Sequence, residues 1–515
     1  MHDSPGTPAN SAIFSAVFRV SVRYCCKNKL MKRFFLFSAI VLVAVSCSKS
    51  DIFGTLIPND GLFMEPTGEG GDKFEDFEDN PFISTAEQPV STFSVDADGA
   101  SYAIVRRYLT DGYDVPKSAV RIEEFLNYFT FDYESPEGPE SVAINAEVAD
   151  CPWAAGHKLM RLGIKGRDFA QGESPKSNYV FLVDVSGSMN SSDKLELLKS
   201  GLIELVDQLD PEDRISIITY SGEVRKWLES TLVRDSETIK KAIRTLVASG
   251  STNGGQAIKI AYEEALDNYI EGGNNRVIMG TDGDFNVGVV STDELVELVE
   301  DYATKGIYLT ACGFGSGNLN DAMMEKISNC GNGTYSYIDC EDELTKVFVN
   351  ERNNLISVAS DSKIQITFNG DVVDSYRLIG YENRVLSNED FENDNKDAGE
   401  VGAGQTITAL YEIIPVQEGV RSDVKYADFD FRYKKALGEE SRPLSLEVRE
   451  NGNVSENFRF AAGVAEFGMI MRQSPYKGES SYESAASLIE SSLTFDPFGY
   501  RLGLLKLINS LEAQD

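Results

Sequence analysis

The sequence predicts an α/β protein that combines a mostly parallel central sheet with β-rich flanking segments and a helical C-terminal tail. Two observations lead to this fold class. Between residues 176 and 357, short apolar runs alternate with segments of helical periodicity, as in sheets covered by helices on both faces. On either side of this region, apolar and polar residues alternate with the period of two that is typical of half-buried antiparallel strands.

The central region opens with an apolar run at residues 179–183, which predicts a strand buried on both faces. Apolar residues at helical spacing predict a helix at 194–209, and a second strand is expected at 213–220. The same alternation continues to the end of the region. Further helices are expected at 236–247, 254–270, 293–305, 318–329 and 341–357, and further strands at 276–279, 306–313 and 334–338.

The flanking segments predict a second, β-rich domain. The strands expected within residues 140–165 are too few for a stable sheet of their own. We therefore expect them to pair with strands within 363–448, so that the central domain is inserted in, or flanked by, one β-sandwich. Residues 458–473 and 481–513 predict two or more amphipathic helices, and the turn-forming residues 496–499 break the second stretch.

Composition excludes several classes of function. The net charge of −34 argues against a nucleic-acid partner, because binding to a phosphate backbone needs a basic surface. The chain has two histidines, His2 and His157, so a zinc site built on imidazoles and a Ser-His-Asp hydrolase are both disfavoured. We expect His157 to be a surface loop residue. The seven cysteines include no CxxC pair, and spacing alone leaves open whether Cys330 and Cys340 are bridged.

The N-terminal region resembles a lipoprotein signal peptide. Two basic residues precede the apolar stretch 34–45, which is too short to span a membrane. Residues 44–47, Ala-Val-Ser-Cys, resemble a lipobox, which implies that Cys47 is lipidated and becomes the mature N-terminus. We interpret the residues before Met31 as an extension from a misplaced start codon. The protein is thus expected in the cell envelope, anchored to the outer membrane through its lipid, with the side of that membrane left open.

After Cys47, the chain is rich in Gly, Asp, Glu and Pro, a composition typical of a flexible tether. The predicted organisation has five parts. They are an upstream extension and signal peptide (1–46), an acidic flexible tether (47–84), an N-terminal flanking region (85–175), the central domain (176–357) and a C-terminal flanking region that is first β-rich and then helical (358–515).

Polar side chains gather where the expected central strands end. Asp184, Ser186 and Ser188 follow the first strand directly, and Asp282 follows a later strand. Thr252 lies between them in a glycine-rich loop that precedes a helix. The carboxyl ends of parallel strands meet at one edge of a sheet, where such sheets bind ligands. Because hydroxyl and carboxylate oxygens are the ligands that Mg²⁺ prefers, the sequence predicts a divalent-metal site there.

This pattern resembles the metal-ion-dependent adhesion site of von Willebrand factor type A (vWA) domains, which have a Rossmann-like fold. The resemblance implies that Ser186 and Ser188 are direct ligands of Mg²⁺, or of Mn²⁺ or Ca²⁺. It implies that Thr252 binds directly or through water, and that Asp184 and Asp282 act mainly through bound water. A Glu or Asp carboxylate of a protein partner would complete the coordination. We expect Asp284 to be a neighbour of the site.

The flanking segments resemble those of the YfbK-like vWA family of bacterial envelope proteins. Residues 91–109 (STFSVDADGASYAIVRRYL) and 119–129 (AVRIEEFLNYF) look like the segment that precedes the vWA domain in that family. Residues 375–394 and 397–413 look like the segment that follows it. The resemblance covers nearly all of 85–515, and it supports the architecture without implying a biochemical role.

Three functions remain open on this sequence. The favoured one is a lipid-anchored module that holds a protein or matrix partner through the metal and catalyses no reaction. The alternatives are a structural envelope scaffold with an unused metal site and a metal-assisted hydrolase. The hydrolase is disfavoured because the sequence offers neither a second metal cluster nor a nucleophile elbow. The glycine-rich run 313–317 and the acidic run 394–399 lack the residues of a phosphate loop and a calcium loop, and both are interpreted as ordinary loops.

Overall fold

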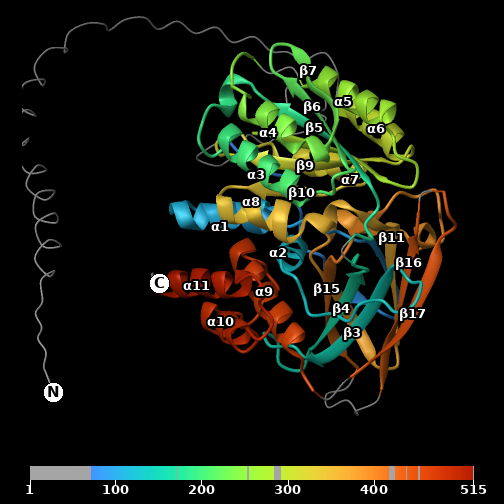
Figure 1. Ribbon diagram of the computed structural model, residues 1–515. Coiled ribbons are helices and arrows are strands. Elements are labelled where there is room, and N and C mark those ends of the chain that lie inside the picture. Colours follow the sequence, from blue (N-terminus) through green and yellow to red (C-terminus); the bar gives the residue numbers. More distant parts are fainter. Residues whose placement is uncertain are drawn as a thin grey trace, which may run out of the picture. The chain divides into compact units, whose positions relative to one another are not determined.

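Three sheets organise the part of the chain that the structure describes (Figure 1). The computed structural model describes residues 71–513, apart from 171, 252–253, 284–291, 417–423, 437 and 451–452. The predicted signal peptide and Cys47 lie outside the described residues, as does His2. Within them, no helix has both the length and the apolar character needed to cross a membrane.

The central sheet has six strands in the order β10-β9-β8-β5-β6-β7. Five are parallel, and β7 runs antiparallel along one edge. Every residue of β5 and β8 is buried, as the continuous apolar runs predict. The strands are β5 (Ser177–Asp184), β6 (Arg214–Tyr220), β7 (Val224–Leu232), β8 (Asn274–Thr281), β9 (Ile307–Phe314) and β10 (Tyr335–Ile338).

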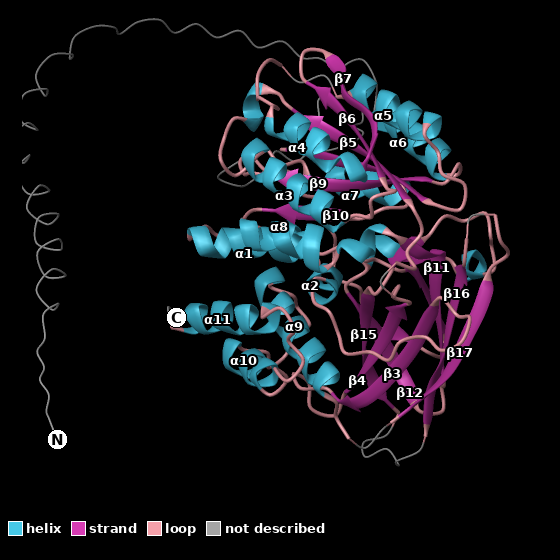
Figure 2. Cartoon of the chain, in the orientation of Figure 1, coloured by secondary structure: helices cyan, strands magenta, loops and turns pink. Residues whose placement is uncertain are grey.

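Helices cover both faces of the central sheet (Figures 1 and 2). Alternate residues of β5 point to opposite faces, so Phe181 and Val183 pack with α3, α4 and α8, while Val180 and Leu182 pack with α5, α6 and α7. This two-sided cover is the predicted α/β arrangement. The helices are α3 (Leu195–Gln208), α4 (Ser236–Arg244), α5 (Gly255–Asp267), α6 (Thr292–Ala303), α7 (Asp321–Cys330) and α8 (Glu341–Thr345).

Two antiparallel sheets form the β-rich domain, and each contains strands from both sides of the central domain. β4 pairs with β15, and β2 pairs with β11. The predicted pairing of early and late strands is therefore confirmed. One sheet has the order β1-β12-β15-β4-β3, made of β1 (Ile83–Ser84), β12 (Val373–Ile379), β15 (Thr406–Pro415), β4 (Lys158–Gly166) and β3 (Val142–Asp150). The other has the order β13-β2-β11-β16-β17 with β14 beside β11, made of β13 (Val385–Leu386), β2 (Val90–Ser94), β11 (Ser357–Phe368), β16 (Lys425–Lys434), β17 (Arg442–Arg449) and β14 (Gly399–Gly402).

The core of this sandwich is aromatic and β-branched. Phe93 on one sheet packs against Tyr411 on the other, with ring centroids 6.2 Å apart. The buried residues of both sheets form one hydrophobic cluster. Sheets whose inner faces interdigitate in this way exclude water from the space between them, which stabilises the sandwich.

Five helices outside the central domain share a core with it. They are α1 (Ala100–Asp111), α2 (Ile122–Asn127), α9 (Glu456–Arg472), α10 (Tyr482–Glu490) and α11 (Tyr500–Glu512). The hydroxyl of Ser455 accepts a hydrogen bond from the backbone N–H of Phe458 and caps α9. Phe467 of α9 packs on Phe125 of α2, with ring centroids 6.0 Å apart. The aromatic residues of the tail thus pack in the protein core, as expected.

Two elements of the central region differ from the prediction. Strand β7 was not predicted because its residues are mostly exposed or half-buried and include several charges, so it carries little apolar signal. The helix expected at 341–357 ends at Thr345 and continues as a π-helical turn (Lys346–Asn350) and a 3-10 turn (Arg352–Leu355). Leu344, Phe348 and Leu355 still pack into one cluster, so side-chain packing is kept while the backbone departs from α-helix.

The tether expected at 47–84 is ordered at its C-terminal end. The carboxylate of Asp72 accepts hydrogen bonds from the backbone N–H groups of Gly317 and Leu319, at 2.9 and 3.1 Å. It also forms a 2.7 Å ion pair with Arg107, and β1 adds a short strand to the first sheet. Composition predicted a flexible segment. It could not show the order at this end, because the partners of Asp72 and β1 lie far away in the sequence.

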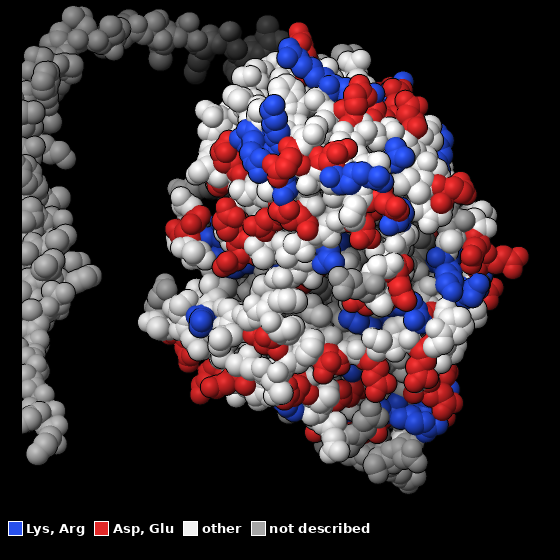
Figure 3. Space-filling view, in the orientation of Figure 1, with Lys and Arg blue, Asp and Glu red and all other residues white. Residues whose placement is uncertain are grey.

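His157 differs from the expectation, and the structure answers the question that spacing left open for Cys330 and Cys340. His157 is half-buried, and its Nδ1 lies 2.5 Å from a carboxylate oxygen of Glu412, so it is not a simple surface residue. Cys330 and Cys340 are free thiols, as are the two other cysteines that the structure describes. On the face drawn in Figure 3, Lys and Arg are interspersed among Asp and Glu without forming one continuous basic surface.

Candidate metal centre

Two buried carboxylates lie at the carboxyl edge of the central sheet. Asp184 is the last residue of β5, and Asp282 directly follows β8. These two strands are neighbours in the sheet, and both side chains are fully buried. β5 is also the strand from which the order runs both ways, to β6 on one side and to β8 on the other. The acids therefore lie at the switch point where such sheets bind ligands.

The turn that follows Asp184 carries two serine hydroxyls, those of Ser186 and Ser188. The backbone N–H of Ser186 donates to Oδ1 of Asp184 at 2.8 Å, which fixes the turn after β5. The hydroxyl oxygens of Ser186 and Ser188 are 2.9 Å apart, and Ser188 is exposed while Ser186 is buried. In an octahedral Mg²⁺ site with ligands at about 2.1 Å, adjacent ligands are about 3 Å apart. The two hydroxyls thus have the spacing of adjacent ligands.

The third loop lies beside the serines. The backbone N–H of Ser249 donates to the carbonyl of Val185 at 2.7 Å, and that of Gly187 donates to the carbonyl of Gly250 at 3.0 Å. Gly250 has a φ of 86°, which favours glycine at this turn. Thr252, two residues further on, lies outside the described residues, as does Asp284. Of the five predicted ligands, the structure brings four together and describes the approach to the fifth.

Three neighbours were not predicted. Nζ of Lys194 lies 3.0 Å from Oδ2 of Asp282 and 3.1 Å from the amide oxygen of Asn318. The hydroxyl of Thr281 donates to Oδ2 of Asp184 at 3.2 Å. Asn318 follows β9 at the same sheet edge. The rule that the carboxyl ends of parallel strands meet at one edge could therefore have identified it as well. Lys194 follows no predicted strand, so no such signal pointed to it. Its side chain reaches the site by passing across Gly315, where an added Cβ would lie 2.2 Å from the lysine side chain.

The two acids have different electrostatic environments. Burial raises the pKa of the Asp184 carboxyl to about 6, against the hydrogen bonds from Ser186 and Thr281. Burial also acts to raise the pKa of Asp282, but hydrogen bonds from Asn318 and Lys194 and the lysine charge outweigh it and leave that pKa below its ordinary value. Among the residues that the structure describes, Asp282 thus has a cationic partner, Lys194, and Asp184 does not. An all-oxygen donor set with one uncompensated buried acid fits a divalent ion.

The comparisons with known proteins agree with this architecture. The model described as "von Willebrand factor type A domain" matches residues 178–350, and the one described as "Uncharacterized protein YfbK, C-terminal" matches residues 353–513. A model described as "von Willebrand factor" matches residues 69–161. The chain is also 39% identical over 464 residues to the protein YfbK of Escherichia coli (strain K12), which covers 85% of this chain and 81% of that protein. The chain belongs to the YfbK family.

Two further similarities of this YfbK-family protein are weaker. It is 33% identical over 180 residues to the inter-alpha-trypsin inhibitor heavy chain H3 of Homo sapiens, which covers 32% of this chain and 20% of that protein. The chain therefore spans about a fifth of that relative. A solved structure, a von Willebrand factor type A protein from Catenulispora acidiphila, is 15% identical with a TM-score of 0.42, and covers 71% of this chain and 88% of that one.

Proposed function

We propose that this protein is a metal-dependent binding module of the cell envelope. A divalent ion, Mg²⁺ or one of similar chemistry, is held by Ser186, Ser188 and Thr252, with Asp184 and Asp282 acting mainly through water. A carboxylate of a protein partner fills the remaining coordination position. The ion serves to hold the partner and not to catalyse a reaction.

One observation carries this proposal. An exposed hydroxyl and a buried one, 2.9 Å apart, lie over two fully buried carboxylates at the switch point of a parallel sheet. Neutral hydroxyls as direct ligands leave the ion with most of its positive charge, because the acids act from the second sphere. Such an ion attracts an additional anionic ligand, and the exposure of Ser188 leaves one side accessible to it.

The surface next to the serine loops suits a protein partner. Trp227 is 39% exposed and Val247 is 73% exposed, and both line a groove together with Ser249 and Gly250 of the third loop. Exposed tryptophan is enriched among the residues that contribute most to protein interfaces. A partner that places its carboxylate on the metal would cover these side chains as well.

The site of action follows from the predicted leader. Lipidation of Cys47 would hold the domain at the outer membrane, with an acidic tether shortened to the residues before Asp72. Intact-mass measurement of the membrane-extracted protein tests this point, because diacylation at Cys47 and loss of residues 1–46 change the mass by a defined amount.

The first experiment is calorimetric titration of Mg²⁺ and Mn²⁺ into the full chain. We expect saturable binding at the predicted site in the wild type and its loss in Asp184→Ala and in the double variant Ser186→Ala/Ser188→Ala. Ser191→Ala is the matched control, because Ser191 is an exposed residue of the same loop whose hydroxyl donates to the half-buried Asp193. Unchanged binding in the first two variants would leave the motif as an ordinary turn and favour the structural scaffold.

The partner is then sought by capture with and without chelator. A partner retained by the wild type, released by chelator and absent from the Asp184→Ala sample supports the proposal. Metal-dependent turnover of model esters or peptides that is lost in the same variant would instead favour the hydrolase.

A further inference from the structure

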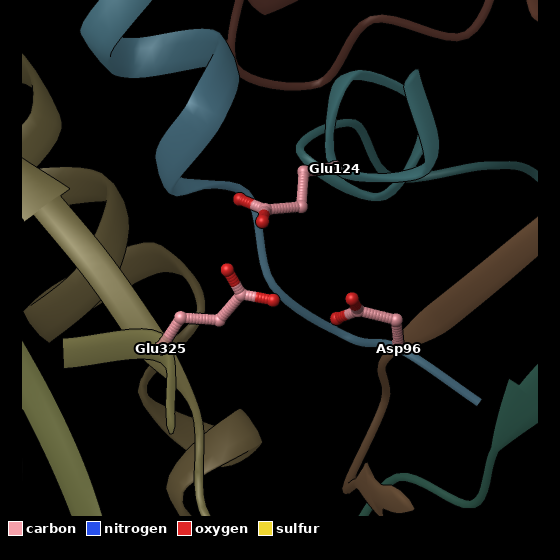
Figure 4. Close-up of side chains that lie close together, drawn as sticks. All are labelled: Asp96, Glu124 and Glu325. Carbon is pink, nitrogen blue, oxygen red and sulfur yellow. The ribbon is translucent and has the colours of Figure 1, made fainter. Parts of the chain in front are cut away.

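A second group of carboxylates lies away from the adhesion site, where the vWA domain meets the flanking region. Asp96 comes from the connection between β2 and α1, Glu124 from α2, and Glu325 from α7 of the vWA domain. Figure 4 shows the three side chains pointing toward one another from these three elements. One oxygen of each lies within 4.8 Å of the other two, and all three residues are buried.

Two arginines neutralise part of this cluster. Arg121 binds Asp321 with two hydrogen bonds, of 2.7 and 3.0 Å, and also contacts Glu124 and Glu325. Arg384 pairs with Asp96 at 3.0 Å and is 4.0 Å from Glu325.

A further acid, Asp98, lies beside the cluster. Its backbone N–H donates to Asp96 at 2.9 Å, and its carboxylate experiences the charges of both Asp96 and Glu124. Five carboxylates and two guanidinium groups are thus buried together, which leaves three negative charges without compensation when all are ionised. Buried charge of one sign is costly unless a counter-charge is present.

One oxygen of Asp98 has no protein partner. Its Oδ1 accepts the backbone N–H of Tyr335 at 2.8 Å, whereas Oδ2 is buried and has no hydrogen-bond partner. The residue is only 3% exposed. Buried polar atoms are almost always satisfied, so this oxygen is available to a ligand that the described protein residues do not supply.

A cavity borders the cluster on the side of Asp96 and Asp98. Asp96, Asp98 and Arg384 line a space of about 130 Å³, together with the carboxyl groups of Asp397 and Glu400. The space is large enough for water molecules, and its acidic walls attract cations. The side of the cluster formed by Asp96 and Asp98 therefore has room for water ligands of an ion.

We propose that Asp96, Asp98, Glu124 and Glu325 bind a calcium ion that joins α7 of the vWA domain to α2 and the β2–α1 connection. Oxygens no more than 4.8 Å apart share a centre within about 2.8 Å of each, so shifts of a few tenths of an ångström give the 2.3–2.6 Å distances of calcium. Mg²⁺ needs distances of about 2.1 Å and strict octahedral geometry, which would require larger shifts. The unpartnered oxygen of Asp98 and cavity water supply the further ligands that calcium takes.

The ion would act as a structural link. Glu325 is the one member of the set that belongs to the vWA domain, and the others belong to segments that precede it in the chain. Binding to the folded state alone stabilises it in proportion to the logarithm of the calcium concentration.

The test uses the full chain carrying Ser186→Ala/Ser188→Ala, because these substitutions remove the proposed adhesion site. Calcium chloride is titrated in by calorimetry after treatment with chelator. We expect one saturable site, at least tenfold weaker for magnesium, and a higher melting temperature with calcium than with chelator. Adding Glu325→Gln or Asp98→Asn should weaken calcium binding at least tenfold and remove the calcium-dependent shift in melting temperature.

Glu466→Gln is the matched control. Glu466 is a fully buried acid of α9 that is not a member of the cluster and has one unpartnered oxygen of its own. This variant should retain calcium binding. Absence of calcium binding in the serine double variant, or binding that both Glu325→Gln and Asp98→Asn leave unchanged, overturns the proposal. Neither result bears on the adhesion site, because that site is already removed.

Discussion

At the scale of single residues, the ammonium group of Lys194 neutralises part of the negative charge of the candidate adhesion site. It lies 3.0 Å from Asp282, which is fully buried. In the metal-free protein it compensates one of the two buried carboxylates, and the other, Asp184, has no such partner. A divalent ion beside the serine hydroxyls would be repelled by this lysine. We therefore expect Lys194 to stabilise the metal-free state and to lower the affinity of the proposed site for metal.

Replacing Lys194 with methionine should strengthen Mg²⁺ binding. Removing one like charge at close range from a partly buried ion is worth about 1 kcal/mol, or roughly fivefold in affinity. The metal-free variant should also melt at a lower temperature, because Asp282 loses its counter-charge. Calorimetry and thermal melting measure both effects, with Lys199→Met on α3, the helix that begins directly after Lys194, as control. Weaker Mg²⁺ binding would mean that the lysine acts by holding Asp282 in position.

At the scale of elements, Asp72 and Lys73 bind the loop 317–319 beside the candidate adhesion site. Asp72 binds the backbone of Gly317 and Leu319, and Asn318 between them contacts Lys194. The backbone N–H of Lys73 also donates to the carbonyl of Leu319 at 2.8 Å. The end of the proposed tether and the candidate metal site thus share one loop, so we expect the position of the proposed anchor to affect the geometry of the site.

Asp72→Ala should release this loop. The substitution leaves two backbone N–H groups without their acceptor and removes the ion-pair partner of the half-buried Arg107, which keeps its hydrogen bonds to Gly315 and Tyr337. We expect a loss of about 1–3 kcal/mol in the free energy of unfolding. Hydrogen exchange of the Gly317 and Leu319 amides should become faster, while exchange in the strands of the sandwich stays unchanged. Asp76→Ala is the control, because Asp76 is exposed in the same segment. Equal exchange in both variants would show that the loop is held by other contacts.

At the scale of the whole molecule, the vWA domain is inserted in a β-sandwich and shares a hydrophobic core with the flanking helices. Many acidic groups are buried where these parts pack together, and this makes the stability of the protein dependent on pH. Glu466 of α9 is a clear case. Burial raises the pKa of its carboxyl from 4.5 to about 7, against a hydrogen bond from Ser484 of α10.

The folded state holds the proton of Glu466 more tightly than the unfolded chain does. Its stabilising contribution is therefore present below about pH 4.5 and is lost as the pH rises through about 7. Glu466→Gln stays neutral throughout, so this variant should be more stable than the wild type near pH 8, by about 1 kcal/mol, with a smaller gain near pH 5. Urea unfolding at the two pH values measures the difference, and the exposed Glu490→Gln is the control. A gain of the same size at both pH values would contradict the assignment.

The sequence by itself determined the local elements and the ligand types. Continuous apolar runs marked β5 and β8 because both faces of those strands are buried, and the strand-end rule placed Asp184, Ser186, Ser188 and Asp282 at one edge. The pairing of early and late strands also followed, because isolated strands cannot form a stable sheet. These features depend on residues that are close together in the chain or on rules that hold for any parallel sheet.

Only the tertiary structure decided the charge partners. Lys194 reaches Asp282 across 88 positions of sequence, Asp72 reaches Gly317 across 245, and Arg121 reaches Asp321 across 200. Charged side chains look alike in a sequence whether they are solvated or buried in pairs, since periodicity reports apolar burial alone. The carboxylate cluster of Asp96, Glu124 and Glu325 was invisible for the same reason, because its members come from three separate elements that meet only after folding.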